Sequence, residues 1–209
     1  PREDDHDAFL AATVHALAGP EDAHVDLLLP DCNGVLRGKR VSAGSLEKVY
    51  AEGVCLPMSL VAADITGNTV EETGLGYDIG DEDRICRPIP GSLRPVPWSP
   101  RPALQLLLAM EDGAGGWFDA HPRRVLERVV DRYRELGLVP VVAVELEFYL
   151  FDRLADADGR PQPTLNASDG ARNASTQVYS IDDLDENAGF IDAVARACRA
   201  QRIPADTAV

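Results

Sequence analysis

The pattern of apolar and polar residues predicts a mixed α+β chain. Residues 25–30 and 35–41 are runs of strand character, and the turn residues of 31–34 separate them, which indicates a β-hairpin. Residues 103–111 form another apolar run of strand length. Residues 44–50 have the spacing of a short helix. These elements are typical of a small α+β unit.

Helical spacing occurs in three further places. Residues 6–18 are expected to form a helix. A second helix is predicted to begin at His121-Pro122, with proline in the first turn, and to end at Gly137. A third is predicted to open at residues 183–186, whose composition resembles a capping box. The second helix has an apolar face made of Val125, Leu126, Val129, Val130, Tyr133 and Leu136.

Residues rich in Gly, Pro and Asp separate these elements. Residues 66–100 are predicted to be turn-rich and 152–175 to be a mobile loop. The apolar run at 57–65 is interpreted as a strand or a buried loop, and 177–180 as a short strand.

We place a domain boundary near residue 101, so that 1–101 and 102–209 form separate domains. The chain stops at Val209 just as a further strand pattern begins, so we expect it to represent part of a longer protein.

Two glutamates within an apolar run carry the strongest chemical signal. Residues 141–151 are β-branched and aromatic apart from Glu145 and Glu147, which predicts a buried strand. Because strand side chains alternate, both glutamates would share one face, with Cα atoms about 7 Å apart. Burying two neighbouring carboxylates is costly without a cation, which favours a hard divalent ion such as Mg²⁺ or Mn²⁺. Ion pairs with basic residues on another strand or chain are the alternative.

Composition narrows the possible functions. The chain has 209 residues, 45% of them hydrophobic and 26% charged, and can bury a core. Its formal charge of −15 argues against a nucleic-acid surface, and no apolar run has membrane-spanning length. The four cysteines form no C-x-x-C pair and the four histidines have no ligand spacing. We therefore expect reduced thiols, a cytoplasmic protein and no zinc site.

Several segments, in order, resemble the glutamine synthetase family. Residues 144–152 resemble the metal-binding Glu-x-Glu strand of that family. Residues 25–41 resemble the N-terminal β-grasp domain of the branch that ligates glutamate to amines, as in γ-glutamylpolyamine synthetases. Residues 88–93 resemble the linker to the catalytic domain, and 119–123 resemble a helix start ahead of the Glu-x-Glu strand. The resemblance implies a β-grasp-like domain followed by the start of a catalytic α/β domain that is incomplete here.

The resemblance also implies an activity. Members of the family are ATP-dependent ligases in which glutamate takes the γ-phosphate of ATP, and ammonia or an amine then displaces phosphate from γ-glutamyl phosphate. By resemblance, Glu145 and Glu147 would hold Mg²⁺ or Mn²⁺ beside ATP and glutamate. Tyr179 would lie near the incoming nitrogen, or would be an ordinary half-buried strand tyrosine. The family also implies a large ring-shaped homo-oligomer.

One departure from the family bears on the nitrogen donor. Ordinary glutamine synthetases carry an Asp-Gly-Ser-Ser stretch that helps to bind ammonium, and residues 57–67 lack it. Asp64 and Thr66 are the candidate replacements, which favours an amine larger than ammonia.

Two other functions remain open. A non-catalytic interaction or regulatory module would keep the fold without the chemistry, and a hydrolase would use Glu145 and Glu147 as acid and base. The family's remaining metal ligands and its nucleotide and glutamate contacts would follow Val209, so we expect the chain alone to be inactive.

Overall fold

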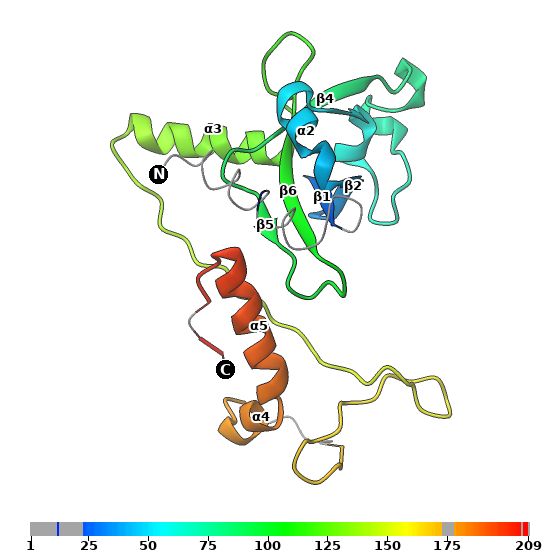
Figure 1. The fold of residues 1–209 in the computed structure, drawn as a ribbon, viewed down its shortest axis with the longest axis vertical. Coiled ribbons are helices and arrows are strands. Elements are labelled where there is room, and N and C mark those ends of the chain that lie inside the picture. Colours follow the sequence, from blue (N-terminus) through cyan, green and yellow to red (C-terminus); the bar gives the residue numbers. More distant parts are fainter. Residues whose placement is uncertain (1–11, 13–22, 173–177, 206, 209) are drawn as a thin grey trace. The chain divides into compact units, whose positions relative to one another are not determined.

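The computed structural model divides the chain into two compact units, Pro1–Pro140 and Val141–Val209, which are described separately (Figure 1). The predicted helix over 6–18 lies outside the described residues, apart from Ala12. The structure describes residues 12, 23–172, 178–205, 207 and 208.

The first unit is built on a six-stranded sheet with strand order β2-β1-β6-β4-β3, in which β5 also pairs with β6. β1 and β2 form the predicted antiparallel hairpin, whereas β1 and β6 are parallel. Parallel neighbours need a long crossover, and the chain between β2 and β6 provides it. The strands are β1 (His24–Pro30), β2 (Leu36–Ser42), β3 (Val54–Pro57), β4 (Asp83–Pro88), β5 (Arg94–Pro95) and β6 (Ala103–Met110).

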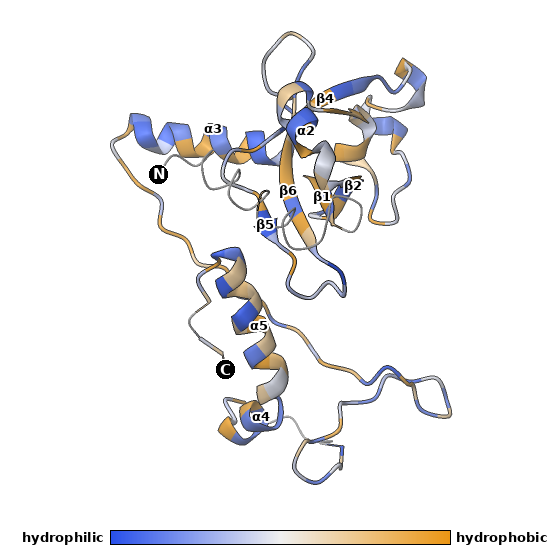
Figure 2. Cartoon of the chain, viewed as in Figure 1, coloured by the Kyte–Doolittle hydropathy of each residue, from blue (hydrophilic) through white to orange (hydrophobic). Residues whose placement is uncertain are grey.

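The core lies on one face of this sheet, which is strongly apolar along β1 and β6 (Figure 2). Alternate residues of β6 are fully buried, as are those of β1, and each such side chain stabilises the fold by about 1.5–3 kcal/mol. Helix α2 (Leu46–Glu52) and the 3₁₀ turn η2 (Met58–Ala62) add side chains to the same core. The predicted helix near 44–50 and the strand at 103–111 are therefore confirmed. Most of the run at 57–65 is neither a strand nor a loop, because residues 58–62 form η2, whose Met58 and Val61 are buried, and Ile65 is exposed.

The turn-rich region over 66–100 also contains strands that its sequence pattern does not predict. Short 3₁₀ turns, η3 (Glu71–Thr73) and η4 (Tyr77–Ile79), precede β4. Four of the six residues of β4 are charged or proline, and Cys86 is its one buried residue. Pairing with β3 and β6, rather than local hydrophobicity, makes this segment a strand.

Helix α3 (Pro122–Glu135) begins where the proline predicts, and Gly137 follows its end with a φ of 69°. Its predicted apolar face is present but exposed, since no residue of the helix is buried. No helix in the described part of the chain has the length and apolar character needed to cross a membrane.

The second unit contains the short helices α4 (Ile181–Glu186) and α5 (Ala188–Gln201). The predicted capping box is wrong by three residues, because the Ser180 hydroxyl accepts a hydrogen bond from the Asp183 amide and caps α4. The predicted strand at 177–180 is also wrong for its described residues, which form a turn. Most of 152–172 is irregular, as expected for a loop.

An α+β fold is thus confirmed. β6 lies in the sheet of the first unit, and the compact units separate between Pro140 and Val141. The boundary near residue 101 concerns the domains of the family and stays a prediction.

Gly38 offers a sharp test of the β1–β2 register. Its φ is 149°, and an added Cβ would lie 1.7 Å from the carbonyl oxygen of Leu27. We expect Gly38→Ala to lower the free energy of unfolding by about 3 kcal/mol or more, measured by urea denaturation. Gly34→Ala is the control, because Gly34 also has a positive φ but open space around it, and should cost about 1 kcal/mol. Equal costs would contradict the register.

Candidate functional site

The segment that carries the two glutamates is extended but unpaired. Residues 139–150 contain no turn, and no backbone hydrogen bond joins them to another described residue (Figure 1). Val141 is 93% exposed and Leu146 is 80% exposed. The prediction of a buried strand is therefore wrong for this structure. A strand forms only where a neighbour satisfies its backbone donors and acceptors, and the described part of the chain supplies none here.

Ring contacts nevertheless show the alternation that the sequence predicts. Tyr149 and Phe151, two residues apart, stack with ring centroids 6.2 Å apart. Phe148, of opposite parity, contacts Phe190 of α5 edge-on, with centroids 5.7 Å apart. If the same alternation continued toward residue 145, as in a paired strand, Glu145 and Glu147 would lie on the side of Tyr149, and this stays a prediction.

Both glutamates are exposed, so burial does not force a cation on them here. Their all-oxygen donor chemistry still suits Mg²⁺ or Mn²⁺, which prefer carboxylates. Two carboxylates are too few to complete an octahedral shell, and no group of three or more His, Cys, Asp or Glu side chains in the described residues could hold a metal ion. The pair therefore fits as part of a metal site.

Tyr179 lies in the turn before α4 rather than in a strand. Its φ of 58° is left-handed and its side chain is 75% exposed. In the described part of the chain it makes no hydrogen bond with either glutamate, so the structure does not bring these three predicted site residues together.

Asp64 organises a tight turn over residues 64–68, called the Asp64 turn below. Its Oδ1 accepts hydrogen bonds from the Thr66 amide, the Thr66 hydroxyl and the Asn68 amide, at 2.8, 2.8 and 2.9 Å. Its Oδ2 accepts one from Asn68 Nδ2 at 2.9 Å. The side chain and amide of Asn68, with those of Thr66, hold the pKa of the Asp64 carboxyl far below its usual range. Asp64 is therefore an ionised, half-buried carboxylate with little freedom to move.

A buried carboxylate that the sequence reasoning did not select lies next to this turn. Asp31, at the end of β1, is 2% exposed. Its Oδ1 accepts from the amides of Asn33 and Val35, both at 2.8 Å, and its Oδ2 accepts from Arg37 Nε at 3.0 Å. Burial alone would raise the pKa of Asp31, but the hydrogen bonds from Val35, Arg37 and Asn33 hold it below its usual value.

The β1–β2 turn and Arg37 of β2 also donate hydrogen bonds to three carbonyls of residues 61–64. The Cys32 amide donates to the Val61 carbonyl at 2.8 Å, and Asn33 Nδ2 donates to the Ala63 carbonyl at 2.8 Å. Arg37 Nη2 donates to the Asp64 carbonyl at 3.0 Å. An Asp followed by an arginine six residues later was the available sequence signal.

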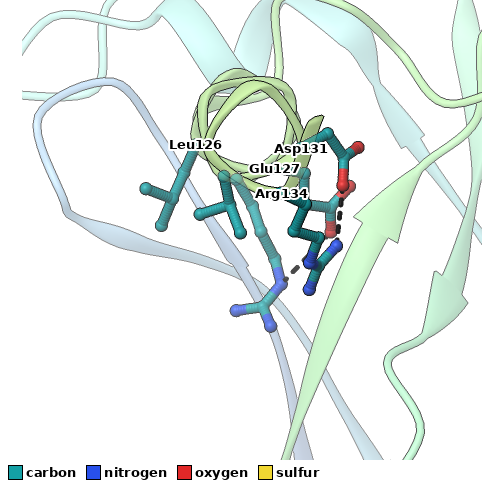
Figure 3. A pocket seen from close by; sticks show the side chains of 6 residues that line it. Leu126, Glu127, Asp131 and Arg134 are labelled. Carbon is teal, nitrogen blue, oxygen red and sulfur yellow. Dashed lines mark hydrogen bonds and ion pairs between the residues drawn. The ribbon is translucent and has the colours of Figure 1, made fainter. Parts of the chain in front are cut away.

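A shallow hollow of about 490 Å³ lies along α3 (Figure 3). Arg134 pairs with Asp131 at 2.7 Å and Arg123 approaches Glu127 at 3.9 Å, so its charged groups largely satisfy one another. None of the predicted site residues lines it.

Comparison with known proteins shows that this α+β chain is similar to ligases. Residues 119–209 match the family described as glutamine synthetase, catalytic domain. The chain is 47% identical over 190 residues to γ-glutamylputrescine synthetase PuuA of Escherichia coli (strain K12), covering 91% of this chain and 40% of the relative. It is 36% identical over 142 residues to γ-glutamylethanolamide synthetase GlnA4 of Streptomyces coelicolor, covering 66% of this chain and 30% of the relative.

The fold agrees with these sequence matches. A solved GmaS/ADP complex superposes with a TM-score of 0.55 at 22% identity, over 91% of this chain and 38% of the other. The chain belongs to the glutamine synthetase family. It spans less than half of the length of these relatives.

The Asp64 turn makes a testable electrostatic prediction. In a carbon-detected NMR titration, the Asp64 carboxyl should titrate below ordinary aspartates, and Asn68→Ala should raise its pKa, because the Asn68 side chain donates directly to Oδ2. Since the folded pKa is depressed, the stability that Asp64 contributes is present above the unfolded pKa of about 3.9 and is lost as the pH falls through the folded value.

Asn33→Ala is the matched control, since Asn33 bonds the Ala63 carbonyl and not the Asp64 carboxylate. An ordinary titration of Asp64 in the unaltered chain would contradict the hydrogen bonding described for this turn.

Proposed function

We propose that this chain is the N-terminal part of an ATP-dependent ligase that joins the γ-carboxyl group of glutamate to an amine. The observation that carries the proposal is the 47% identity, over 91% of the chain, to a protein named as a γ-glutamylputrescine synthetase. A second relative is named for another γ-glutamyl amine.

The chemistry requires charge neutralisation, because glutamate and ATP are both anions and phosphoryl transfer develops further negative charge. Glu145 and Glu147 would hold one or two divalent ions, Mg²⁺ or Mn²⁺, through carboxylate oxygens on one side of the same segment. A divalent ion held by these residues would supply positive charge to offset the negative charge of the reactants and of the phosphoryl group. Attack of the glutamate γ-carboxylate on the γ-phosphate of ATP would release ADP and form γ-glutamyl phosphate, and the amine would then displace phosphate from it.

Asp64 is the candidate residue for binding the acceptor amine. Its carboxylate is ionised and half-buried, and Oδ2 accepts only one described hydrogen bond. An ammonium group could therefore approach Oδ2 without breaking the turn. Tyr179 is the other acceptor candidate, through its exposed hydroxyl. The absence of an Asp-Gly-Ser-Ser stretch favours an amine over ammonia.

In the complete enzyme, further strands and neighbouring subunits would complete the catalytic domain and its site. We propose that residues 1–101 correspond to a β-grasp-like domain and 102–209 to the start of the catalytic domain. Segment 139–150 would pair with strands from the rest of the ligase, which explains its exposed aliphatic side chains here. A ring-shaped homo-oligomer would combine sites from neighbouring subunits. The chain alone should not catalyse.

The metal assignment is tested in the complete ligase. Glu145→Gln or Glu147→Gln should lower γ-glutamyl transfer at least about 100-fold and weaken Mn²⁺ binding in a calorimetric titration, because each removes an anionic ligand. The oligomer mass should not change.

Glu135→Gln, at the exposed end of α3, is the matched control and should keep full activity. Unaltered turnover in either Glu145 or Glu147 variant would refute the metal role of that residue.

The acceptor is tested with a panel of amines. Putrescine, ethanolamine and ammonia should be compared under saturating ATP and glutamate, by phosphate release and by mass of the product. We expect kcat/KM for at least one amine to exceed that for ammonia about tenfold or more. A preference for ammonia would overturn the acceptor proposal while leaving the ligase proposal intact.

A further inference from the structure

We propose that Arg37 is a positioning residue, which fixes the Asp64 turn to the buried carboxylate of Asp31 and thereby sets the affinity for the acceptor amine. The acceptor part of this inference rests on the proposed function, whereas the positioning part does not. Nothing in the chemistry proposed above uses Arg37 or Asp31.

The guanidinium bridges two groups that belong to different parts of the fold. Its Nε donates to Asp31 Oδ2 and its Nη2 donates to the Asp64 carbonyl, both at 3.0 Å. Asp31 cannot shift to follow a displaced partner, because its Oδ1 is held by two backbone amides and the residue is buried. Arg37 therefore links the Asp64 turn to a fixed point in the β1–β2 turn.

The shape of the Asp64 turn fits against this guanidinium. Gly67 has a φ of 95°, and a Cβ added there would lie 2.9 Å from Arg37 Nη1. The Gly67 amide also closes the turn by donating to the Asp64 carbonyl, the same oxygen that Arg37 bonds. Arg37 thus helps to fix the position of the Asp64 turn, together with the bonds from Cys32 and Asn33 to the Val61 and Ala63 carbonyls.

To bond Asp31 and the Asp64 carbonyl at the same time, the side chain must be a planar group that donates hydrogen bonds in two fixed directions. Lysine would keep a positive charge beside Asp31 but cannot donate along two fixed directions. Arg37→Lys should therefore fold, because it does not leave the buried Asp31 without a cation, and yet release the Asp64 turn.

The matched control is on the same strand. Arg40 forms an ion pair with Asp26 at 2.6 Å, but that pair is at the surface and bonds no carbonyl of the 57–68 region in the described residues. Arg40→Lys makes the same chemical change where no turn depends on it.

The first measurement is hydrogen exchange of the backbone amides of Cys32 and Gly67 by NMR, on the 209-residue chain. We expect Arg37→Lys to increase their exchange rates about tenfold or more, and Arg40→Lys to leave them within about twofold. Unchanged exchange in Arg37→Lys would overturn the proposal, whatever the ligase does.

The second measurement is steady-state kinetics of the complete ligase. Arg37→Lys should raise KM for the amine about tenfold while KM for glutamate stays within about twofold, since the loss concerns acceptor placement. Equal changes in both KM values, or no change in either, would overturn the acceptor part. If the unaltered ligase forms no γ-glutamyl amide, the proposed function and the acceptor part fall together, and the exchange data still decide the positioning part.

Discussion

Strand pairing decides which parts of this chain are folded. β6 has partners on both sides, and its alternate side chains fill the core together with those of β1. Segment 139–150 is also largely apolar, yet it stays exposed because no described strand completes its hydrogen bonds. Hydrophobicity alone therefore does not produce a strand here, and neighbours that satisfy the backbone are required as well.

The sequence predicts those elements whose determinants are local. The β1–β2 hairpin, α2 and α3 each carry their own turn residue, apolar spacing or N-terminal proline. The sequence does not predict β4 because four of its six residues are charged or proline, and only pairing with β3 and β6 reveals the strand. The strand predicted at 141–151 has a strong local signal, but residues 141–150 do not form a strand because no other described segment pairs with them.

The residues of the candidate site also divide into those that a local pattern predicts and those that only the fold reveals. Glu145 and Glu147 stand out from their pattern. Phe148 and Tyr149 contact different rings, whereas the shared face of the two glutamates stays a prediction. Asp31 and Arg37 were not selected, because an aspartate in a turn and an arginine on an edge strand are individually ordinary. The hydrogen bonds from Arg37 to the Asp64 carbonyl and from Asn33 to the Ala63 carbonyl depend on how two distant segments are brought together, which no local pattern reveals.

The unpaired segment also has a consequence for how the chain behaves in concentrated solution. An extended apolar stretch with free backbone groups is a template for intermolecular β-pairing, and hence for aggregation. Glu145 and Glu147 interrupt that stretch with two like charges, which repel identical copies stacked in register. The residues proposed to bind metal would therefore also act as gatekeepers against self-association, and a divalent cation that neutralised them would remove this protection.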